Sequence, residues 1–273
     1  MLIRVVIEDS SACALPTEHG LCLWVEACGR RFFMDLGQTS LFADNCARMD
    51  INPQDADFAV ISHGHYDHGG GIPKFLELNG TAPVYVHRAA FGDHYSTRDG
   101  KVKYIGLPHN LQGHKRIVLT DGIVRIADCI TIFSGCSGNA FFSPANARIL
   151  KKEADRLVCD DFCHEQSLIV SEGPCNVLFA GCGHSGILNI LARAEEISGS
   201  PVTHVIAGLH LAGIEDPAFI ASFAAALAAK PCTYYTLHCT GPTAFAALKP
   251  FLADRLTYLP AGTTIHIPNI EKP

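Results

Sequence analysis

One short segment concentrates side chains that are suited to metal chemistry. An apolar run at 58–61 is typical of a buried strand, which delivers the residues after it rigidly to the edge of a sheet. Glycines at 69–71 then allow a sharp turn before a helix that we expect to begin near Ile72. Between the two lie three histidines and an aspartate within six positions, namely His63, His65, Asp67 and His68. The segment therefore predicts a metal site at the end of a strand.

The spacing of these ligands favours two ions over one. His63 and His65 are two positions apart, so on an extended segment both point to one side and can share an ion about 2.0–2.1 Å from each nitrogen. Asp67 and His68 offer an oxygen and a third imidazole from a different angle. This mixed donor set favours zinc, with manganese or iron(II) as alternatives, and two adjacent ions would lower the pKa of a shared water. A histidine-rich turn that binds nothing would crowd these side chains without a gain in packing.

Other histidines follow other apolar runs and are expected to complete the two metal shells. His184 lies in a glycine-flanked turn after 177–180, and we expect it to close the shell of the first ion. His238 follows 233–237 and is expected to close the second. His210 also follows a strand and is expected beside the metals or facing the substrate. Asp67, as an acceptor for the attacking group, and His210, as a partner of the departing oxygen, are the expected catalytic residues.

The pattern His-x-His-x-Asp-His after a hydrophobic strand resembles the signature of the metallo-β-lactamase fold superfamily. Further motifs occur in the order found in one branch, that of the 7,8-dihydropterin-6-methyl-4-(β-D-ribofuranosyl)aminobenzene 5′-phosphate synthases. The resemblance spans roughly residues 17–265. The motifs that carry it, besides the metal segment, are Glu18-His19-Gly20-Leu21 and those at 32–37, 181–187, 208–211 and 237–241.

The resemblance implies a four-layer αββα sandwich with two divalent ions. It also implies an enzyme that joins a dihydropterin diphosphate to a ribofuranosylaminobenzene phosphate and releases diphosphate. Asp35 is expected to orient one of the ligating histidines or to tie the neighbouring turn. Many relatives have a strand that ends in Gly-Asp, whose carboxylate bridges the metals, but here Cys182 stands at that place, either as a bridging thiolate or as a packing residue. His164 is an alternative to His184 as the third histidine of the first ion.

Composition agrees with a compact enzyme. The 273 residues are 48% hydrophobic and 18% charged, which is enough to bury a large core. A net charge of −6 gives no basic stripe, so we expect a small anionic or phosphorylated substrate and no nucleic-acid partner. No run of about 18 apolar residues exists, and residues 1–9 are typical of an edge or hairpin strand rather than a signal peptide, so we expect cytoplasmic residence and no membrane partner. The 12 cysteines are then expected to stay reduced, with core positions for Cys22, Cys28, Cys46 and Cys129.

Strand and helix patterns alternate along the chain, which fits an α/β or α+β class and one domain over 1–273. Irregular, substrate-facing loops are expected near 88–116 and 135–161. Their cations Arg98, Lys101, Lys103 and Lys115 are interpreted as a solvated face, with phosphate binding as the alternative. Helices are expected at 41–49, 73–78, 187–198 and 217–229. Strands are expected at 21–26, 31–35, 58–61, 84–87, 167–170, 176–180, 202–207 and 233–237, with a β meander over 117–119, 122–127 and 130–133.

Three other functions fit the same ligands. A metal-dependent hydrolase of a small phosphorylated or cyclic ester would use the ions to activate water. A redox protein would use a di-iron site, although no flavin-binding segment accompanies it. A sensor would bind a pterin or nucleotide without turnover. The oligomeric state does not follow from the sequence.

Overall fold

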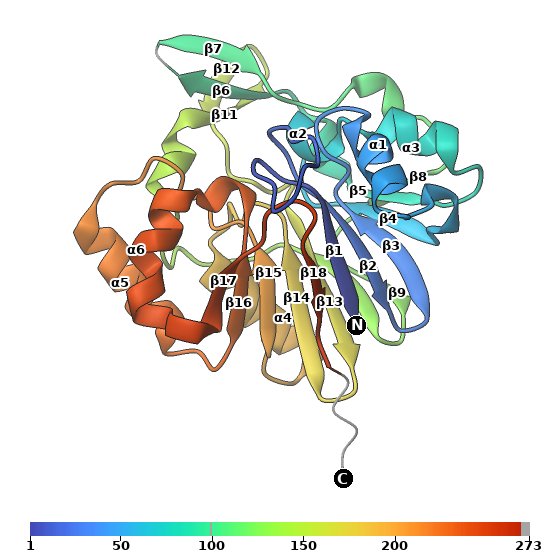
Figure 1. The fold of residues 1–273 in the computed structure, drawn as a ribbon. Helices are drawn as coiled ribbons and strands as arrows, with labels where there is room; N and C mark the ends of the chain where they lie inside the picture. Colours follow the sequence, from blue (N-terminus) through green and yellow to red (C-terminus); the bar gives the residue numbers. More distant parts are fainter. Residues whose placement is uncertain (99, 269–273) are drawn as a thin grey trace.

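Two seven-stranded sheets dominate the computed structural model, which describes residues 1–98 and 100–268 (Figure 1). In the first sheet, β3, β4, β5 and β8 run parallel to one another, and in the second β14 to β17 do so. The first sheet has the order β18 (Thr264–His266), β1 (Leu2–Ile7), β2 (Cys22–Ala27), β3 (Arg30–Met34), β4 (Phe58–Ile61), β5 (Val84–His87), β8 (Ile117–Thr120). The second has the order β17 (Leu256–Tyr258), β16 (Thr233–Thr236), β15 (His204–Ala207), β14 (Cys175–Ala180), β13 (Gln166–Glu172), β10 (Ile130–Ser134), β9 (Ile123–Ala127).

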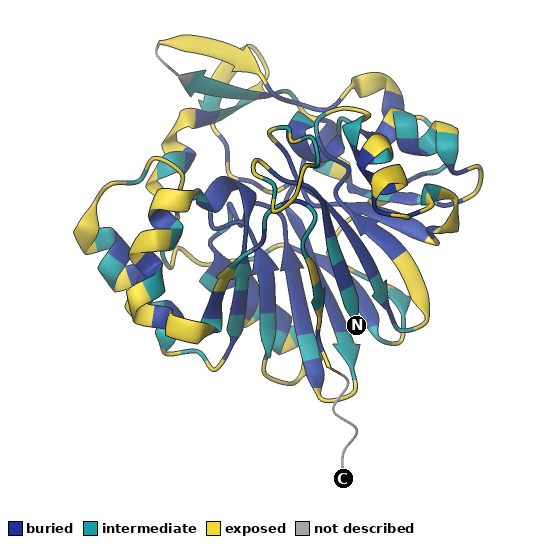
Figure 2. Ribbon diagram, viewed as in Figure 1, coloured by how far each residue is buried: buried dark blue, intermediate teal, exposed yellow. Residues whose placement is uncertain are grey.

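The sheets pack face to face, and helices cover their outer faces (Figure 1). A central apolar layer joins the sheets, and its aromatic side chains include Phe32, which stacks on Phe58 at 4.7 Å, and Phe179 of the other sheet. Each such buried side chain contributes about 1.5–3 kcal/mol. Figure 2 shows the strands dark with burial and the helices exposed on their outer faces. The helices are α1 (Leu41–Arg48) and α3 (Ile72–Leu78) on the first sheet, and α4 (Ile187–Ser198), α5 (Pro217–Ala228) and α6 (Pro242–Leu252) on the second.

The predicted α/β (α+β) class and four-layer αββα sandwich are confirmed. The buried strand β4 and the helix α4 have the predicted bounds. In the part of the chain that the structure describes, no helix has the length and apolarity needed to cross a membrane.

A third, four-stranded sheet stands above one edge of the sandwich, and we call it the arm (Figure 1). It corrects the expectation that 88–116 and 135–161 are irregular, because each segment supplies two of its strands; residue 99 lies outside the described residues. The strands are short and polar, and the two hairpins that they form pair with each other across more than 50 positions of sequence, as in the register of Ile149 with Ser96. Apolar periodicity alone does not reveal such pairing. The order is β12 (Arg156–Cys159), β11 (Ile149–Glu153), β6 (His94–Arg98), β7 (Lys101–Tyr104).

Strand pairing corrects one further expectation and decides between the two alternatives of another. The predicted meander does not form, because β8 pairs in parallel with β5 in the first sheet while β9 and β10 form a hairpin in the second. Residues 1–9 were expected to form either an edge strand or a hairpin strand, and β1 forms a hairpin with β2. It does not lie at the edge of the sheet, because β18 pairs with its other side. In both cases the partner strand is distant in sequence.

Two cysteines that were expected to be reduced core residues are joined. Cys28 lies in the turn between β2 and β3, Cys129 lies in the turn between β9 and β10, and a disulfide links them. The two hairpins belong to different sheets, and only the packing of the sheets brings their turns together. Cys22 and Cys46 are buried free thiols, as expected.

Candidate metal centre

The candidate site lies where parallel strands of both sheets end. The chain leaves β4 just before His63, β14 shortly before His184, and β16 shortly before His238. Because the carboxyl ends of parallel strands meet at one edge of a sheet, two facing sheets bring their ligands to a common edge. The short helix α2 (Tyr66–Gly69) then turns the chain, with His65 at its N-cap.

Three imidazoles form one group. The ring centroids of His63 and His65 lie 4.4 Å apart, and His184 lies 4.9 Å from the first and 5.1 Å from the second. All three residues are buried, and the Nε2 atom of each has no hydrogen-bond partner within the described residues. Buried polar atoms are nearly always paired, so three unpaired nitrogens that converge indicate a missing ligand. The group fits one metal ion.

A second group lies beside the first. The Asp67 Oδ2 atom is 3.4 Å from His238 Nε2 and 3.8 Å from His68 Nε2. The rings of His68 and His238 are 5.0 Å apart, and the ring of His68 is 4.2 Å from that of His63. The structure therefore brings together all six sequence-predicted ligands in two adjacent groups of three.

Hydrogen bonds on the far side of the rings hold the ligand nitrogens in place. The Nδ1 atom of His68 lies 2.6 Å from Asp35 Oδ2, that of His238 lies 2.8 Å from Asp9 Oδ1, and that of His184 lies 3.0 Å from Asn146 Oδ1. Since a carboxylate or amide oxygen only accepts, each Nδ1 carries the proton and each Nε2 keeps its lone pair. This is the arrangement that fixes a histidine as a metal ligand. The role expected of Asp35 thus matches its contact with His68.

The shifts in pKa favour neutral imidazoles in the first group and an ionised Asp67 carboxylate in the second. Burial, reinforced by neighbouring imidazoles, lowers the pKa of His63, His65 and His184 well below the usual histidine value. Burial raises the pKa of Asp67, but His68 and His238 outweigh it and leave a net lowering. For His238, burial opposes the charged form, yet hydrogen bonds to Asp67 and Asp9 raise its pKa. The two carboxylates thus favour positive charge at this position.

Strained backbone marks the same residues. Asp35, His210 and His238 have φ angles of 61°, 49° and 48°. Such left-handed conformations cost about 1–3 kcal/mol for non-glycine residues and persist where surrounding contacts fix them. Here Glu8 accepts a hydrogen bond from the backbone N–H of His238 at 2.7 Å, and Asp35 accepts one from Ser62 N at 2.7 Å.

His164, the alternative third histidine, is near but already bonded on both nitrogens. Its Nδ1 accepts a hydrogen bond from Gly64 N at 3.0 Å, so its Nε2 carries the proton and donates to Asp160 at 3.3 Å. Its ring lies 6.0 Å from that of His63. In contrast, the Nε2 atom of His184 has no protein partner. The hydrogen-bond pattern therefore favours His184.

Cys182 lies between the two groups. Its sulfur is 3.2 Å from His68 Nε2, and it falls within 4.8 Å of the ligand atoms of His63 and His184 as well as those of His68 and His238. The thiol is buried, and burial raises its pKa. Its position suits a bridging thiolate, one of the two roles that the sequence left open.

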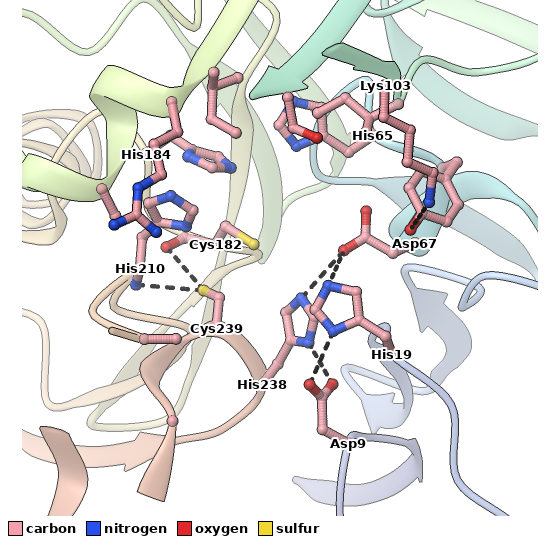
Figure 3. Close-up of a pocket in the computed structure, with 18 of the residues that line it drawn as sticks. Asp9, His19, His65, Asp67, Lys103, Cys182, His184, His210, His238 and Cys239 are labelled. Atoms are coloured by element: carbon pink, nitrogen blue, oxygen red, sulfur yellow. Dashed lines mark hydrogen bonds and ion pairs between the residues drawn. The ribbon is translucent and has the colours of Figure 1, made fainter. Parts of the chain in front are cut away.

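A cavity of about 840 Å³ opens over the site. Figure 3 shows His65, His184, His238 and Asp67 directed towards it, with Cys182 between them. His210 also lines the cavity, and its ring lies 4.1 Å from that of His184, outside both groups of three. His19, from the motif at 18–21, lines it too and contacts Asp9 at 2.9 Å and Asp67 at 3.3 Å. Its neighbour Glu18 instead accepts hydrogen bonds from the backbone of Gln38 and Thr39.

Sequence reasoning missed Asp9 and Asn146. Asp9 precedes its partner His238 by 229 positions, and Asn146 lies in a 3-10 turn within a segment expected to be irregular. Neither stands in a recognisable motif. Only the metal motif itself signalled that its histidines would need acceptors somewhere in the chain.

The contact with Asn146 gives a testable expectation. Asn146→Ala removes both the acceptor for His184 Nδ1 and the donor to the His184 carbonyl at 2.8 Å. We expect zinc affinity to fall about tenfold to a hundredfold, as is usual when a partner of a ligating histidine is lost. Competition with a chromophoric chelator measures it. Asn176→Ala, which removes only a hydrogen bond to Pro201 O, is the control, and equal affinities in both variants would contradict the expectation.

Comparisons with known proteins agree with this geometry. An uncharacterized protein of Methanocaldococcus jannaschii is 25% identical over 256 residues, covering 90% of this chain and 93% of that protein. The 7,8-dihydropterin-6-methyl-4-(β-D-ribofuranosyl)-aminobenzene-5′-phosphate synthase of the same organism is 25% identical over 259 residues, covering 88% of this chain and 87% of the synthase.

Solved structures show the same fold. Tm1679, a metal-dependent hydrolase of the β-lactamase superfamily, matches with a TM-score of 0.83 at 25% identity over 98% of this chain and 99% of that one. Zinc-bound PqqB of Methylobacterium extorquens matches with a TM-score of 0.56 at 11% identity, over 98% and 100% of the two chains. The model of the metallo-β-lactamase superfamily matches residues 34–187, which is more than half of the sequence. This chain therefore belongs to the metallo-β-lactamase superfamily.

Proposed function

We propose that the protein is a dinuclear metal-dependent enzyme that acts on a small anionic molecule, as a transferase that releases diphosphate. The observation that carries the proposal is the set of unpaired Nε2 atoms on His63, His65 and His184, next to a second group in which Asp67 lies between two further imidazoles. The relative named as a dihydropterin-ribofuranosylaminobenzene phosphate synthase supports the choice of reaction.

The donor set fits two divalent ions, and zinc suits its mixture of imidazole, carboxylate and thiol; manganese or iron(II) are alternatives. His63, His65 and His184 would hold one ion, and Asp67, His68 and His238 the other. When bound, the pair would supply positive charge to the diphosphate oxygens of the substrate. Cys182 would lie between the ions.

The remaining residues would position the substrate and manage protons. In the transfer, the bond between the pterin methylene carbon and the diphosphate oxygen breaks while the second substrate supplies the new bond to that carbon. His210, on the cavity wall with its Nδ1 free of a protein partner, would hold a proton for the departing oxygen. Asp67, held ionised by neighbouring imidazoles, would stay an acceptor throughout.

A direct experiment tests the proposal. Protein purified without added metal should contain two ions per chain by elemental analysis. Supplied with 7,8-dihydropterin-6-methyl diphosphate and ribofuranosylaminobenzene phosphate, it should release diphosphate and form the joined product, detected by mass spectrometry. Failure to bind two ions would overturn the dinuclear site, whereas two ions with no release of diphosphate would overturn the transfer alone.

A hydrolase is the second candidate, because the similar structure Tm1679 is described as a metal-dependent hydrolase. The same groups would then direct a water at a phosphorylated or cyclic ester, with Asp67 accepting a hydrogen bond from it. Release of phosphate or acid from such esters, without a requirement for an acceptor, would favour this candidate. A non-catalytic sensor would bind the ions and turn over none of these compounds.

A further inference from the structure

The arm is rigidly joined to the metal segment. Tyr66 N, next to His65, donates a hydrogen bond to Ile105 O at 2.9 Å, and Ile105 N donates to His94 O at 2.8 Å. His65 also pairs with Gly106 as an isolated β-bridge. The backbone that leaves the arm strand β7 therefore runs directly along the metal motif.

A buried network fixes the other side of the arm. Asp160, which follows β12, accepts hydrogen bonds from His94 at 2.8 Å and from His164 at 3.3 Å, and His164 holds Gly64 between the ligands His63 and His65. Asp160, His94 and His164 are all buried. Hydrogen bonds in a buried network of this kind restrict the positions of its members, although the Nε2 atom of His94 has no partner among the described residues. The inner face of the arm therefore stands at a fixed position relative to the metal groups.

Cations gather on that inner face. Lys101 and Lys103 of β7 line the cavity, and Arg148, just before β11, joins them. Of the described residues that line the cavity, the carboxylates are Asp9 and Asp67, and both belong to the metal end. In a chain whose formal net charge is −6, the cavity thus has a positive wall opposite its ligand groups.

These cations are not neutralised by the protein. Among the described residues, no carboxylate forms a salt bridge with Lys101, Lys103 or Arg148, whereas Lys151 on the same arm pairs with both Glu153 and Asp161 at 2.8 Å. Lys103 instead lies over the ring of Tyr66, 4.8 Å from its centroid, and donates to its hydroxyl at 3.2 Å. Figure 3 shows Lys103 on the cavity wall above Asp67, away from Asp9.

We propose that Lys101, Lys103 and Arg148 form an anion subsite, separate from the metal groups, for a phosphate group at the end of the substrate remote from the reacting bond. The inference rests on the proposed function in taking the metal end as the place of reaction. A phosphate dianion suits three cations that line one cavity better than a carboxylate, because it offers more acceptor oxygens and charge. The substrate is accordingly two-ended, with one anionic group on the ions and a phosphate on the arm.

Calorimetric titration of the zinc-loaded full-length protein with inorganic phosphate at low ionic strength tests the subsite. Wild-type protein should bind two phosphates, one at the ions and one on the arm. The triple variant Lys101→Met, Lys103→Met, Arg148→Met should bind one, and Lys103→Met alone should weaken the arm site by about tenfold. Lys152→Met is the matched control, because Lys152 lies on the arm but does not line the cavity, and it should retain both sites.

The outcomes separate this inference from the proposed function. If the ions are absent but the subsite exists, wild-type protein binds one phosphate and the triple variant binds none. If the triple variant binds as many phosphates as wild type with equal affinity, the subsite is overturned. Acetate that competes as strongly as phosphate for the arm site would overturn the preference for a phosphate group.

Discussion

His184→Ala should leave the protein with one tightly bound ion instead of two. The side chain supplies one of the three unpaired imidazole nitrogens that we propose as ligands of the first ion, and Asn146 already holds its other nitrogen. Loss of a ligand's hydrogen-bond partner typically lowers metal affinity tenfold to a hundredfold. Loss of the whole ligand should lower it further, so we expect the affinity for the first ion to fall about a hundredfold or more. Elemental analysis after dialysis against a weak chelator gives the stoichiometry, and turnover should fall with it.

His164→Asn is the decisive counterpart. Asparagine keeps an acceptor close to where Gly64 N donates to His164, so the loop between His63 and His65 retains its hydrogen bond. We expect this variant to keep both ions. His204→Ala serves as a further control, because His204 stacks on Tyr235 and lies outside the metal groups. If His164→Asn lost an ion while His184→Ala kept both, the third ligand of the first ion would be His164.

Gly71→Ala should destabilise the whole fold. A Cβ atom at this position would lie 2.2 Å from Leu36 O and 2.9 Å from a ring atom of Phe42. Since the first contact is with backbone, relief requires moving the chain that follows β3, next to Asp35 and its bond to His68. We expect the free energy of unfolding to fall by about 3 kcal/mol, as for severe overpacking, and metal content to fall as well.

Urea denaturation of the metal-loaded protein measures this effect. Gly80→Ala is the matched control: a Cβ there meets nothing within 4 Å, and we expect a change within about 0.5 kcal/mol. Equal urea midpoints for Gly71→Ala and wild type would contradict the prediction, because they would show that the backbone at Leu36 can move at little cost in stability. The sequence suggested that the glycines at 69–71 serve a sharp turn, but Gly70 and Gly71 have helical φ angles of −64° and −77°. Close approach of neighbouring backbone is what requires glycine at Gly71.

The residues that meet at the candidate metal centre could be predicted because their signal is local. Each follows an apolar strand, and parallel strands end at a common edge, so strand patterns were enough to bring His63, His184 and His238 together. The resemblance to a known family added the four layers. The identity of strands such as β4 follows from four consecutive buried apolar residues.

What could not be predicted depends on pairs that are distant in sequence. Asp9 meets His238 across 229 positions, and Cys28 meets Cys129 across 101. The arm could not be predicted for another reason. All four residues of β7 are exposed, so no buried apolar face marks the strand. The proposed role of its lysines could not be predicted either, because lysines on a polar strand are usually solvated. Only the position of Lys103 on the cavity wall indicates a role in binding.

The bonds around Glu8 bear on when the site becomes complete during synthesis. Its carboxylate accepts from His238 N and from the Tyr258 hydroxyl at 2.6 Å, so Glu8 depends on two residues that are synthesised 230 and 250 positions after it. Contacts this distant in sequence form late, because the entropy of closing long loops must be overcome first. The nascent chain would carry the ligands of the His63 segment long before their partners emerge. Stable metal uptake should therefore follow synthesis of the segment that contains His238 and Tyr258.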